Sequence, residues 1–444
     1  MSGLTKFFEL FAIDTKYIFA VLGVILAIFI FINIAPSGSE VFGYLFAIVP
    51  VFLPFAMFFL FYEAWMDYVK LEYKQKLGRV TLEIRLPQEV FKSPEAMELV
   101  LIQMHQTNAS DNFAESYLDG RHPPKFSLEI VSRGGDVRFY ISTPVSKYKN
   151  IIETQLYAQY PGVEVHVLDI DYTAEIPYDT NKYSYFSFHY GLKKADAYPI
   201  KTYIEFGLDK MPKEEEKIDP IATMLETLGN IGPNEFFWIQ ILIDANREVG
   251  FKDGYLHKHE DWKDSARAEI KKIIVNAAKR VGIKEDDLKE KGSNMNQLLT
   301  DAEKDTIKAI ERSLGKNAFN TAIRGMYIAH KEAYKPWDRL PALNTAWRSY
   351  DDLNRNAIGV RWRTDFDWKK FQDPSGKRAE KYKKAELKHY KQRKYDNYAS
   401  SDTPKIMTTE EIATIFHFPG KVVTTPTLAR IPSKRSEAPS NLPT

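Results

Sequence analysis

Cysteine is absent from all 444 residues of the chain. This absence excludes disulfide bonds, thiolate metal sites and a cysteine nucleophile. The sequence also lacks a phosphate-binding loop of the form G-x-x-x-x-G-K-[ST], because Gly420-Lys421 is followed by Val422 and has no glycine at the required upstream position. Neither G-x-S-x-G nor H-E-x-x-H occurs. We therefore expect a protein that is not an enzyme and that holds no cofactor and no metal.

A strong net charge is missing as well. The chain has 61 Lys and Arg against 59 Asp and Glu, a formal net charge of +2. The charge is unevenly distributed, because residues 361–444 hold 18 basic and 10 acidic side chains, a net of +8, and residues 1–360 hold 43 and 49, a net of -6. Any polyanion-binding role therefore belongs to the carboxy-terminal part. The length predicts two or three domains.

Two long apolar runs near the amino terminus predict a membrane anchor. Between residues 17 and 62 the only ionisable acid or base is Glu40. The runs 17–35 and 41–62 are each about 20 residues long, the length that an α-helix needs to cross a bilayer. We therefore expect residues 1–78 to form a transmembrane hairpin. The alternatives are a cleaved signal peptide for the first run and a buried soluble hairpin for both.

Basic residues flank this hairpin on one side. Lys6 and Lys16 precede it, several lysines follow it, and the turn between the runs has none. The positive-inside rule then predicts a multi-pass protein of the inner (cytoplasmic) membrane, with both termini and the main body in the cytoplasm.

The central part of the chain has a doubled α/β pattern, so the expected fold class is α+β. Alternating apolar residues, a Gly134-Gly135 turn and helical spacings give the order β-α-β-β-α-β in residues 79–175, which is a ferredoxin-like unit. A second unit is expected over 176–363, with its first strand at 200–208 and a helical insertion at about 251–318. The resemblance between the two halves is weak in sequence and rests on the order of elements.

Residues 364–400 are predicted to contain a basic helix with interleaved tyrosines. Such a segment binds nucleic acid, with tyrosines stacked on bases, binds anionic lipid, or is a solvated charged helix. The candidate polyanion contacts are Lys377, Arg378, Lys381, Lys383, Lys384, Lys388, Lys391, Arg393, Lys394, Tyr382 and Tyr390.

Residues 401–444 are predicted to form a short helix and an extended proline-rich tail. The helix begins with a capping box, Thr408-x-x-Glu411, and ends at Pro419. We expect this segment to dock a partner protein. The candidate docking residues are Glu411, Ile412, Ile415, Phe416, His417, Phe418 and Pro419.

These segments resemble a known family. The run 409–419, whose most specific part is Phe416-His417-Phe418-Pro419, and the runs 425–426 and 438–443 are similar to the segment upstream of the motor domain in membrane-anchored conjugative-transfer ATPases. These ATPases are type IV secretion coupling proteins and HerA/FtsK-like relatives. Residues 126–131, 137–141 and 158–161 resemble their amino-terminal domain. The chain has no phosphate loop, so the resemblance implies an ATPase on a separate polypeptide.

Two hypotheses follow. The first is a non-enzymatic inner-membrane subunit of a type IV secretion-like or conjugation-like translocation machine, which anchors and docks a separately encoded ATPase and oligomerises, by analogy as a ring. The second is a structural membrane scaffold that oligomerises through its repeated α/β domains and has no part in DNA or protein transport. The expected partners are membrane lipid, the ATPase, further copies of the chain and, through the basic helix, nucleic acid.

Overall fold

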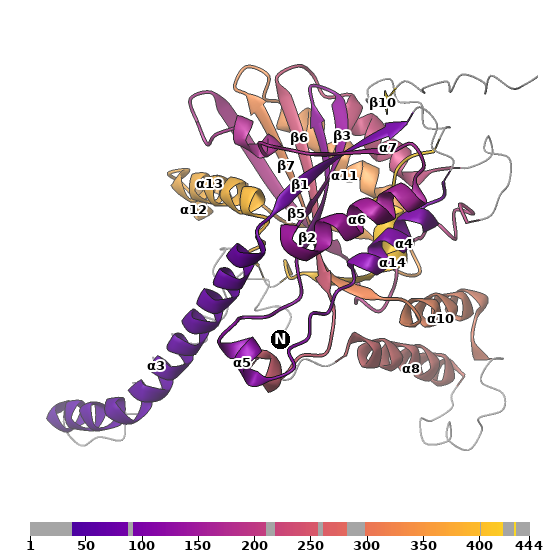
Figure 1. Ribbon diagram of the computed structural model, residues 1–444. Helices are drawn as coiled ribbons and strands as arrows, with labels where there is room; N and C mark the ends of the chain where they lie inside the picture. Colours follow the sequence, from indigo (N-terminus) through magenta and orange to yellow (C-terminus); the bar gives the residue numbers. More distant parts are fainter. Residues whose placement is uncertain are drawn as a thin grey trace, which may run out of the picture.

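The computed structural model describes residues 38–87, 92–209, 218–255, 261–281, 298–399, 401–420 and 430–431. Its centre is an α+β body, as the alternating pattern of the sequence predicts. Within these residues the strands form one ten-stranded sheet with the order β10-β1-β3-β2-β6-β7-β5-β8, in which β4 also pairs with β1 and β9 (Lys405–Thr408) with β7 (Figure 1).

The first half of the sheet has the order β-α-β-β-α-β. Its strands lie in the order β4-β1-β3-β2, which is the arrangement of a ferredoxin-like unit. The Gly134-Gly135 turn joins β2 to β3, and both glycines have positive φ angles of 56° and 92°. The elements are β1 (Val80–Pro87), α4 (Glu95–Met104), β2 (Phe126–Arg133), β3 (Asp136–Thr143), α6 (Val145–Gln159) and β4 (Glu164–Val167).

The second half repeats this order and joins the first edge to edge. β2 pairs antiparallel with β6 over eight residue pairs, from Phe126 with Ile243 to Arg133 with Phe236. The two units therefore share one continuous sheet. The elements are β5 (Tyr183–Leu192), α7 (Pro220–Gly229), β6 (Glu235–Ala245), β7 (Ala318–His330), α11 (Pro336–Ala346) and β8 (Ile358–Arg363).

The first strand of the second unit is β5, so its predicted position at 200–208 is wrong. Residues 203–209 form turns. Ile200, Tyr203 and Leu208 are nevertheless buried in the core, which explains why their apolar spacing resembles that of a strand. The true strand contains Ser187 and His189 on its less apolar face, which weakens its alternation.

A helical insertion separates β6 from β7, as predicted. Its described parts are a short 3-10 helix at Phe251–Asp253, α8 (Trp262–Arg280) and α10 (Asp301–Leu314). Trp262, Ala266 and Ile310 form a small core between these helices and the start of β7.

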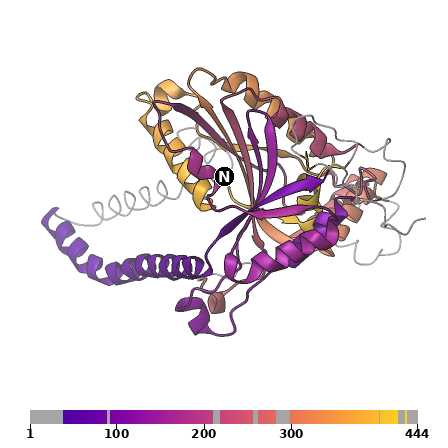
Figure 2. The ribbon, with the colours of Figure 1, turned by 45° about the horizontal axis from the view of Figure 1, so that its top comes forward.

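The two faces of the sheet are covered differently. The larger core lies between the sheet and a layer of helices that includes α4, α6, α7, α11 and α14 (Thr409–Ile415). A second core on the opposite face is formed by residues such as Trp238 and Tyr140 with Tyr390 of α13 (Lys377–Gln392). Figures 1 and 2 show α13 on the side of the sheet opposite to α4 and α6.

The amino-terminal part of the structure corrects the membrane prediction. The first expected span, 17–35, lies outside the described residues. The second, 41–62, is not a separate helix, because it belongs to α3 (Gly38–Leu77), which continues through Tyr62 into a charged half and projects from the body (Figure 1). Within the described residues no helix has both the length and the apolar character needed to cross a bilayer. The charged half contains Glu63, Asp67, Lys70, Glu72, Lys74 and Lys76.

The predictions of a transmembrane hairpin and of a multi-pass inner-membrane protein are therefore wrong for the described part of the chain. The carboxy-terminal end of α3 is instead fixed to the body. Met66 and Val69 are buried, and the indole N–H of Trp65 donates a hydrogen bond to the carbonyl oxygen of Tyr117 over 2.7 Å.

Candidate functional site

The basic helix predicted within 364–400 is present as α13, and its sequence explains where it begins and ends. Gly376 precedes it with a positive φ of 71°, and Arg393 follows it with a φ of 50°. The buried carboxylate of Asp373 accepts hydrogen bonds from the backbone N–H groups of Arg378 and Ala379, over 3.2 and 2.8 Å. The carboxylate thus satisfies amide groups that the first turn of a helix leaves without partners.

One face of α13 is packed onto the sheet. Glu386, Leu387 and Tyr390 are buried, and their spacing of one and four residues places them on one side of the helix. The ring of Tyr390 lies 5.1 Å from that of Trp238 in β6. α13 is therefore amphipathic, although its composition is strongly basic.

A buried histidine holds this face in place. His189 of β5 lies 2.8 Å from Glu386 through Nε2 and 2.8 Å from Asp402 through Nδ1, and all three side chains are buried. Burial lowers the pKa of His189, but the carboxylates of Glu386 and Asp402 outweigh this effect and raise the pKa to about 9. The imidazolium therefore links α13 and the segment after it to the second unit.

Two buried arginines fix the end of the helix. Arg393 Nε lies 3.0 Å from Glu129 Oε1, and its Nη2 lies 2.7 Å from Asp171 Oδ2. Arg324 of β7 donates to Gln240 Oε1 and, over 2.8 Å, to the carbonyl oxygen of His389. The guanidinium of Arg393, which the sequence predicts to contact a polyanion, therefore forms ion pairs within the body instead.

The outer face of α13 carries four lysines. Lys377, Lys381, Lys384 and Lys388 are exposed, and their intervals of four, three and four residues align them along one side of the helix. They extend over about 16 Å at 1.5 Å per residue. We call these four residues the lysine face.

The other predicted polyanion contacts are less accessible than the lysine face. The guanidinium of Arg378 lies over the rings of Phe366 and Tyr382, at 5.4 and 5.9 Å from their centroids. Lys391 Nζ donates to the carbonyl oxygen of Ile176 over 2.8 Å. Tyr382 and Lys383 are half-buried and Tyr390 is buried, whereas Lys394 is exposed and lies 3.1 Å from Asp396.

Burial lowers the pKa of both Lys383 and Lys391. These two lysines are therefore weaker candidates for binding phosphate than the four residues of the lysine face.

The predicted docking residues are inside the body. α14 packs among α4, α7 and β3, and Phe416 and Phe418 lie with their rings 5.7 and 5.4 Å from that of Phe139. His417 Nε2 lies 3.0 Å from Asp219 Oδ1 at the start of α7. The side chains of the predicted docking residues are therefore not accessible to a partner in this fold. The buried set is Glu411, Ile412, Ile415, Phe416, His417, Phe418 and Pro419.

The carboxylate of Glu411 has an internal role. Its oxygens accept hydrogen bonds from the backbone N–H groups of Ile200 and Thr408, over 3.1 and 2.9 Å. Burial raises the pKa of Glu411 to about 7. The capping box predicted at Thr408 and Glu411 is present, so the residues that the sequence assigns to docking complete the helix layer.

The predicted extended tail lies mainly outside the described residues, apart from β10 (Arg430–Ile431), which pairs with β1.

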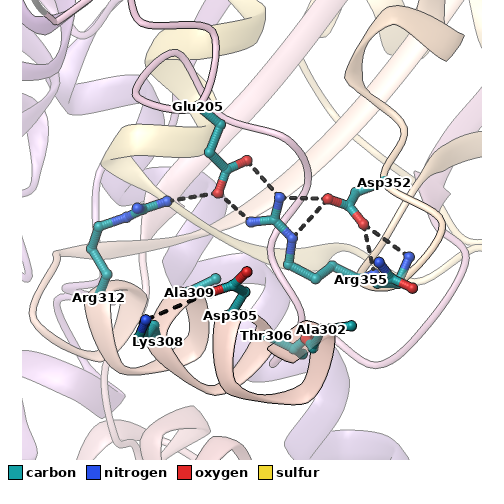
Figure 3. Close-up of a pocket in the computed structure, with 10 residues that line it drawn as sticks. Glu205, Ala302, Asp305, Thr306, Lys308, Ala309, Arg312, Asp352 and Arg355 are labelled. Carbon is teal, nitrogen blue, oxygen red and sulfur yellow. Dashed lines mark hydrogen bonds and ion pairs between the residues drawn. The ribbon is translucent and has the colours of Figure 1, made fainter. Parts of the chain in front are cut away.

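A cavity of about 380 Å³ lies between α10 and the loop at 352–355. Its charged groups are paired with one another (Figure 3). Arg355 lies between Glu205 and Asp352, and Arg312 Nη2 lies 3.1 Å from Glu205 Oε1. This network of ion pairs connects α10 to the neighbouring loops. Because the charged side chains that line the cavity are paired with one another, we interpret the cavity as part of the structural framework.

Among the residues that the structure describes, no group of three or more His, Asp or Glu side chains is placed to hold a metal ion. The sequence did not predict the partners that hold α13, which are all buried except the partly exposed Asp171. They are His189, Asp402, Glu129, Asp171, Arg324 and Gln240. The signal that could have revealed these partners is the presence of polar residues among the apolar ones of β2, β5, β6 and β7.

These features define a double ferredoxin-like α+β protein with a basic helix fixed on the outer face of its sheet. A family model described as a domain of unknown function, DUF8128, matches residues 70–430. The match spans most of the chain, so the protein belongs to this family. No curated protein matches the chain.

Proposed function

We propose that the protein is a non-enzymatic nucleic-acid-binding subunit that contacts phosphates through the lysine face of α13. The observation that carries the proposal is the alignment of Lys377, Lys381, Lys384 and Lys388 on the solvent side of a helix whose other side is fixed by Glu386 and Tyr390. A fixed helix presents its charges with little further ordering of the backbone, and binding of lysines to phosphates releases counterions.

The proposal is tested on the full chain with a fluorescently labelled oligonucleotide across a series of salt concentrations. The variant replaces Lys381, Lys384 and Lys388 with Gln. We expect weaker binding and a slope of log K against log salt that is shallower by about 2 to 3, because each lost phosphate contact changes the slope by about 0.7 to 0.9. The matched control replaces Lys271, Lys272 and Lys279, three exposed lysines of α8, with Gln.

Two results would overturn this function. One is an absence of binding by the unmodified protein. The other is an equal effect of the α13 and α8 substitutions, since binding would then reflect overall charge. Anionic vesicles are measured in parallel, and binding to vesicles without binding to oligonucleotide would also contradict the proposal.

An adaptor for a separately encoded motor ATPase is the second candidate. Its support is the resemblance of residues 409–419 to the segment upstream of such motors. Because α14 is part of the core, deletion of the whole segment would disrupt the body. β10 places Arg430 and Ile431 beside Leu86 and Pro87 at the sheet edge. The test is therefore a chain truncated after Ile431, and equal recovery of an ATPase by the truncated and full chains would contradict docking through the residues that follow.

A further inference from the structure

Two aromatic side chains are exposed in the segment that leads into α13. Trp368 precedes α12 (Lys369–Gln372) and Phe371 lies within it, and their side chains are 57% and 77% exposed. Lys369 and Lys370, which lie between them, are exposed as well. The sequence Trp-Lys-Lys-Phe thus presents two rings and two positive charges to solvent.

α12 is joined directly to the start of α13. The backbone N–H of Asp373, the residue after α12, donates to the carbonyl oxygen of Lys369 over 3.0 Å. The Asp373 carboxylate accepts hydrogen bonds from the backbone N–H groups of Arg378 and Ala379 in the first turn of α13. Figure 1 shows α12 next to one end of α13. The two exposed rings therefore lie close to the amino-terminal end of α13, where Lys377 begins the lysine face.

Other aromatic residues of this region are packed. The rings of Trp362 and Tyr398 are stacked with centroids 4.3 Å apart, and Tyr382 lies 5.3 Å from Tyr398. Residues 362–398 thus pack these three half-buried rings against one another and leave Trp368 and Phe371 exposed. Exposed apolar rings close to positive charge are the features of a surface that stacks on bases and binds phosphates.

The charge around the rings favours an anionic partner. Residues 361–394 contain 13 Lys and Arg against 5 Asp and Glu. Two of the five acids, Asp373 and Glu386, are buried and paired within the body. A third, Asp367, pairs with Arg363. When Asp373, Glu386 and the buried Arg393 are left out, 12 Lys and Arg against 3 Asp and Glu remain, so the accessible surface of this stretch is strongly positive.

We propose that Trp368 and Phe371 stack on unpaired bases of a single-stranded nucleic acid whose phosphates lie along Lys369, Lys370 and the lysine face. This inference rests on the proposed function and adds the class of nucleic acid. Bases within a duplex are stacked on one another, so exposed rings gain little from them. Every base of a single strand has a face that is free to stack.

The experiment measures the affinity of the full chain for oligothymidylate and for a duplex of the same length across a series of salt concentrations. The variants are Trp368→Ala, Phe371→Ala and their combination. We expect each single substitution to weaken binding to the single strand by about fivefold or more, the lower end of the range for base stacking. We expect the salt dependence and the affinity for the duplex to stay unchanged.

Trp337→Ala is the matched control, because Trp337 is 69% exposed and lies in α11, in the helix layer on the opposite face of the sheet. Its affinity should equal that of the unmodified protein. The inference is overturned if the Trp368 and Phe371 variants bind oligothymidylate as tightly as this control, or if the unmodified protein binds the duplex as well as the single strand.

The outcomes separate this inference from the proposed function. Binding that depends on the lysine face but not on the two rings would contradict the stacking inference and leave the function standing. An absence of binding to either nucleic acid would contradict both. Thermal unfolding of each variant, which should match the unmodified protein because both rings are exposed, excludes loss of the fold as the cause of weaker binding.

Discussion

His189 Nε2 and Glu386 Oε2 lie 2.8 Å apart, with both side chains fully buried. The contact joins β5 of the second ferredoxin-like unit to the basic helix α13. A charged pair at this depth is favourable only when its remaining polar atoms also have partners. Asp402 provides one for the other ring nitrogen. The position of the lysine face thus depends on a charge cluster that lies beneath it.

The first prediction concerns the pH dependence of stability. The pKa of His189 is raised from 6.5 to about 9 in the folded protein. A raised pKa gives stability that is fully present below pH 6.5 and is lost as the pH rises through about 9. The loss is at most about 3 kcal/mol, at 1.36 kcal/mol for each pKa unit. Urea unfolding at a series of pH values measures it.

The His189→Gln variant tests the origin of this effect. Its unfolding free energy should be lower at pH 6 and should change less between pH 6.5 and 9. His166→Gln is the control, since the His166 side chain is 44% exposed. An unchanged pH dependence in His189→Gln would assign the effect to other groups.

The second prediction concerns Arg393 and its two carboxylate partners. Glu129→Ala leaves a buried guanidinium with only the partly exposed Asp171 as its acidic partner. We expect a loss of about 3 kcal/mol in the unfolding free energy, because removal of one member of a buried ion pair leaves an uncompensated charge. Asp171→Ala should cost less, since its side chain is 30% exposed.

A double variant separates the pair from its surroundings. Glu129→Leu combined with Arg393→Met removes both charges, and it should be more stable than Glu129→Ala alone. Urea unfolding of the three variants gives the comparison. A double variant that is less stable than Glu129→Ala would show that the remaining contacts of Arg393, its ion pair with Asp171 and its hydrogen bond to the carbonyl oxygen of Lys391, outweigh the cost of its uncompensated charge.

The sequence predicts the doubled fold well where one face of a strand is apolar. The hairpin around Gly134-Gly135 alternates cleanly, so its strands and turn agree with β2 and β3. β5 was missed because Ser187 and His189 interrupt the alternation on a face that buries polar groups. The membrane prediction failed for a different reason. Sequence windows measure hydrophobicity locally, whereas α3 continues as one helix into a charged half that packs on the body.

The candidate site was predictable in part. The lysine face follows from spacing alone, but the burial of Tyr390 and Arg393 depends on partners 150 or more residues away. The same holds for Phe416 and Phe418, whose apolar character fits a docking surface and a core equally well. A docking surface differs from a core in the solvent exposure of its side chains, and the tertiary structure decides which side chains are exposed.

The third prediction tests whether the segment 411–419 belongs to the core. Phe416→Ala should lower the unfolding free energy by about 3 to 5 kcal/mol, since it removes a buried ring that packs on Phe139. Phe371→Ala removes the same atoms from a ring that is 77% exposed. This substitution should change the unfolding free energy by less than about 0.5 kcal/mol. Equal stability of the two variants would show that the segment leaves the core in solution.

The last prediction concerns the attachment of α3 to the body at Gly120. Gly120 and Gly207 have nearly the same positive φ angle, 65° and 68°. A Cβ at Gly120 would lie 2.3 Å from the carbonyl oxygen of Val69 in α3, whereas a Cβ at Gly207 would meet no atom within 4 Å. Gly207→Ala should therefore cost only the left-handed backbone strain of about 1 kcal/mol. Gly120→Ala should cost clearly more and should increase hydrogen exchange at Val69 and Tyr117. Equal losses in the two variants, measured by urea unfolding, would show that α3 moves away from Gly120 without cost.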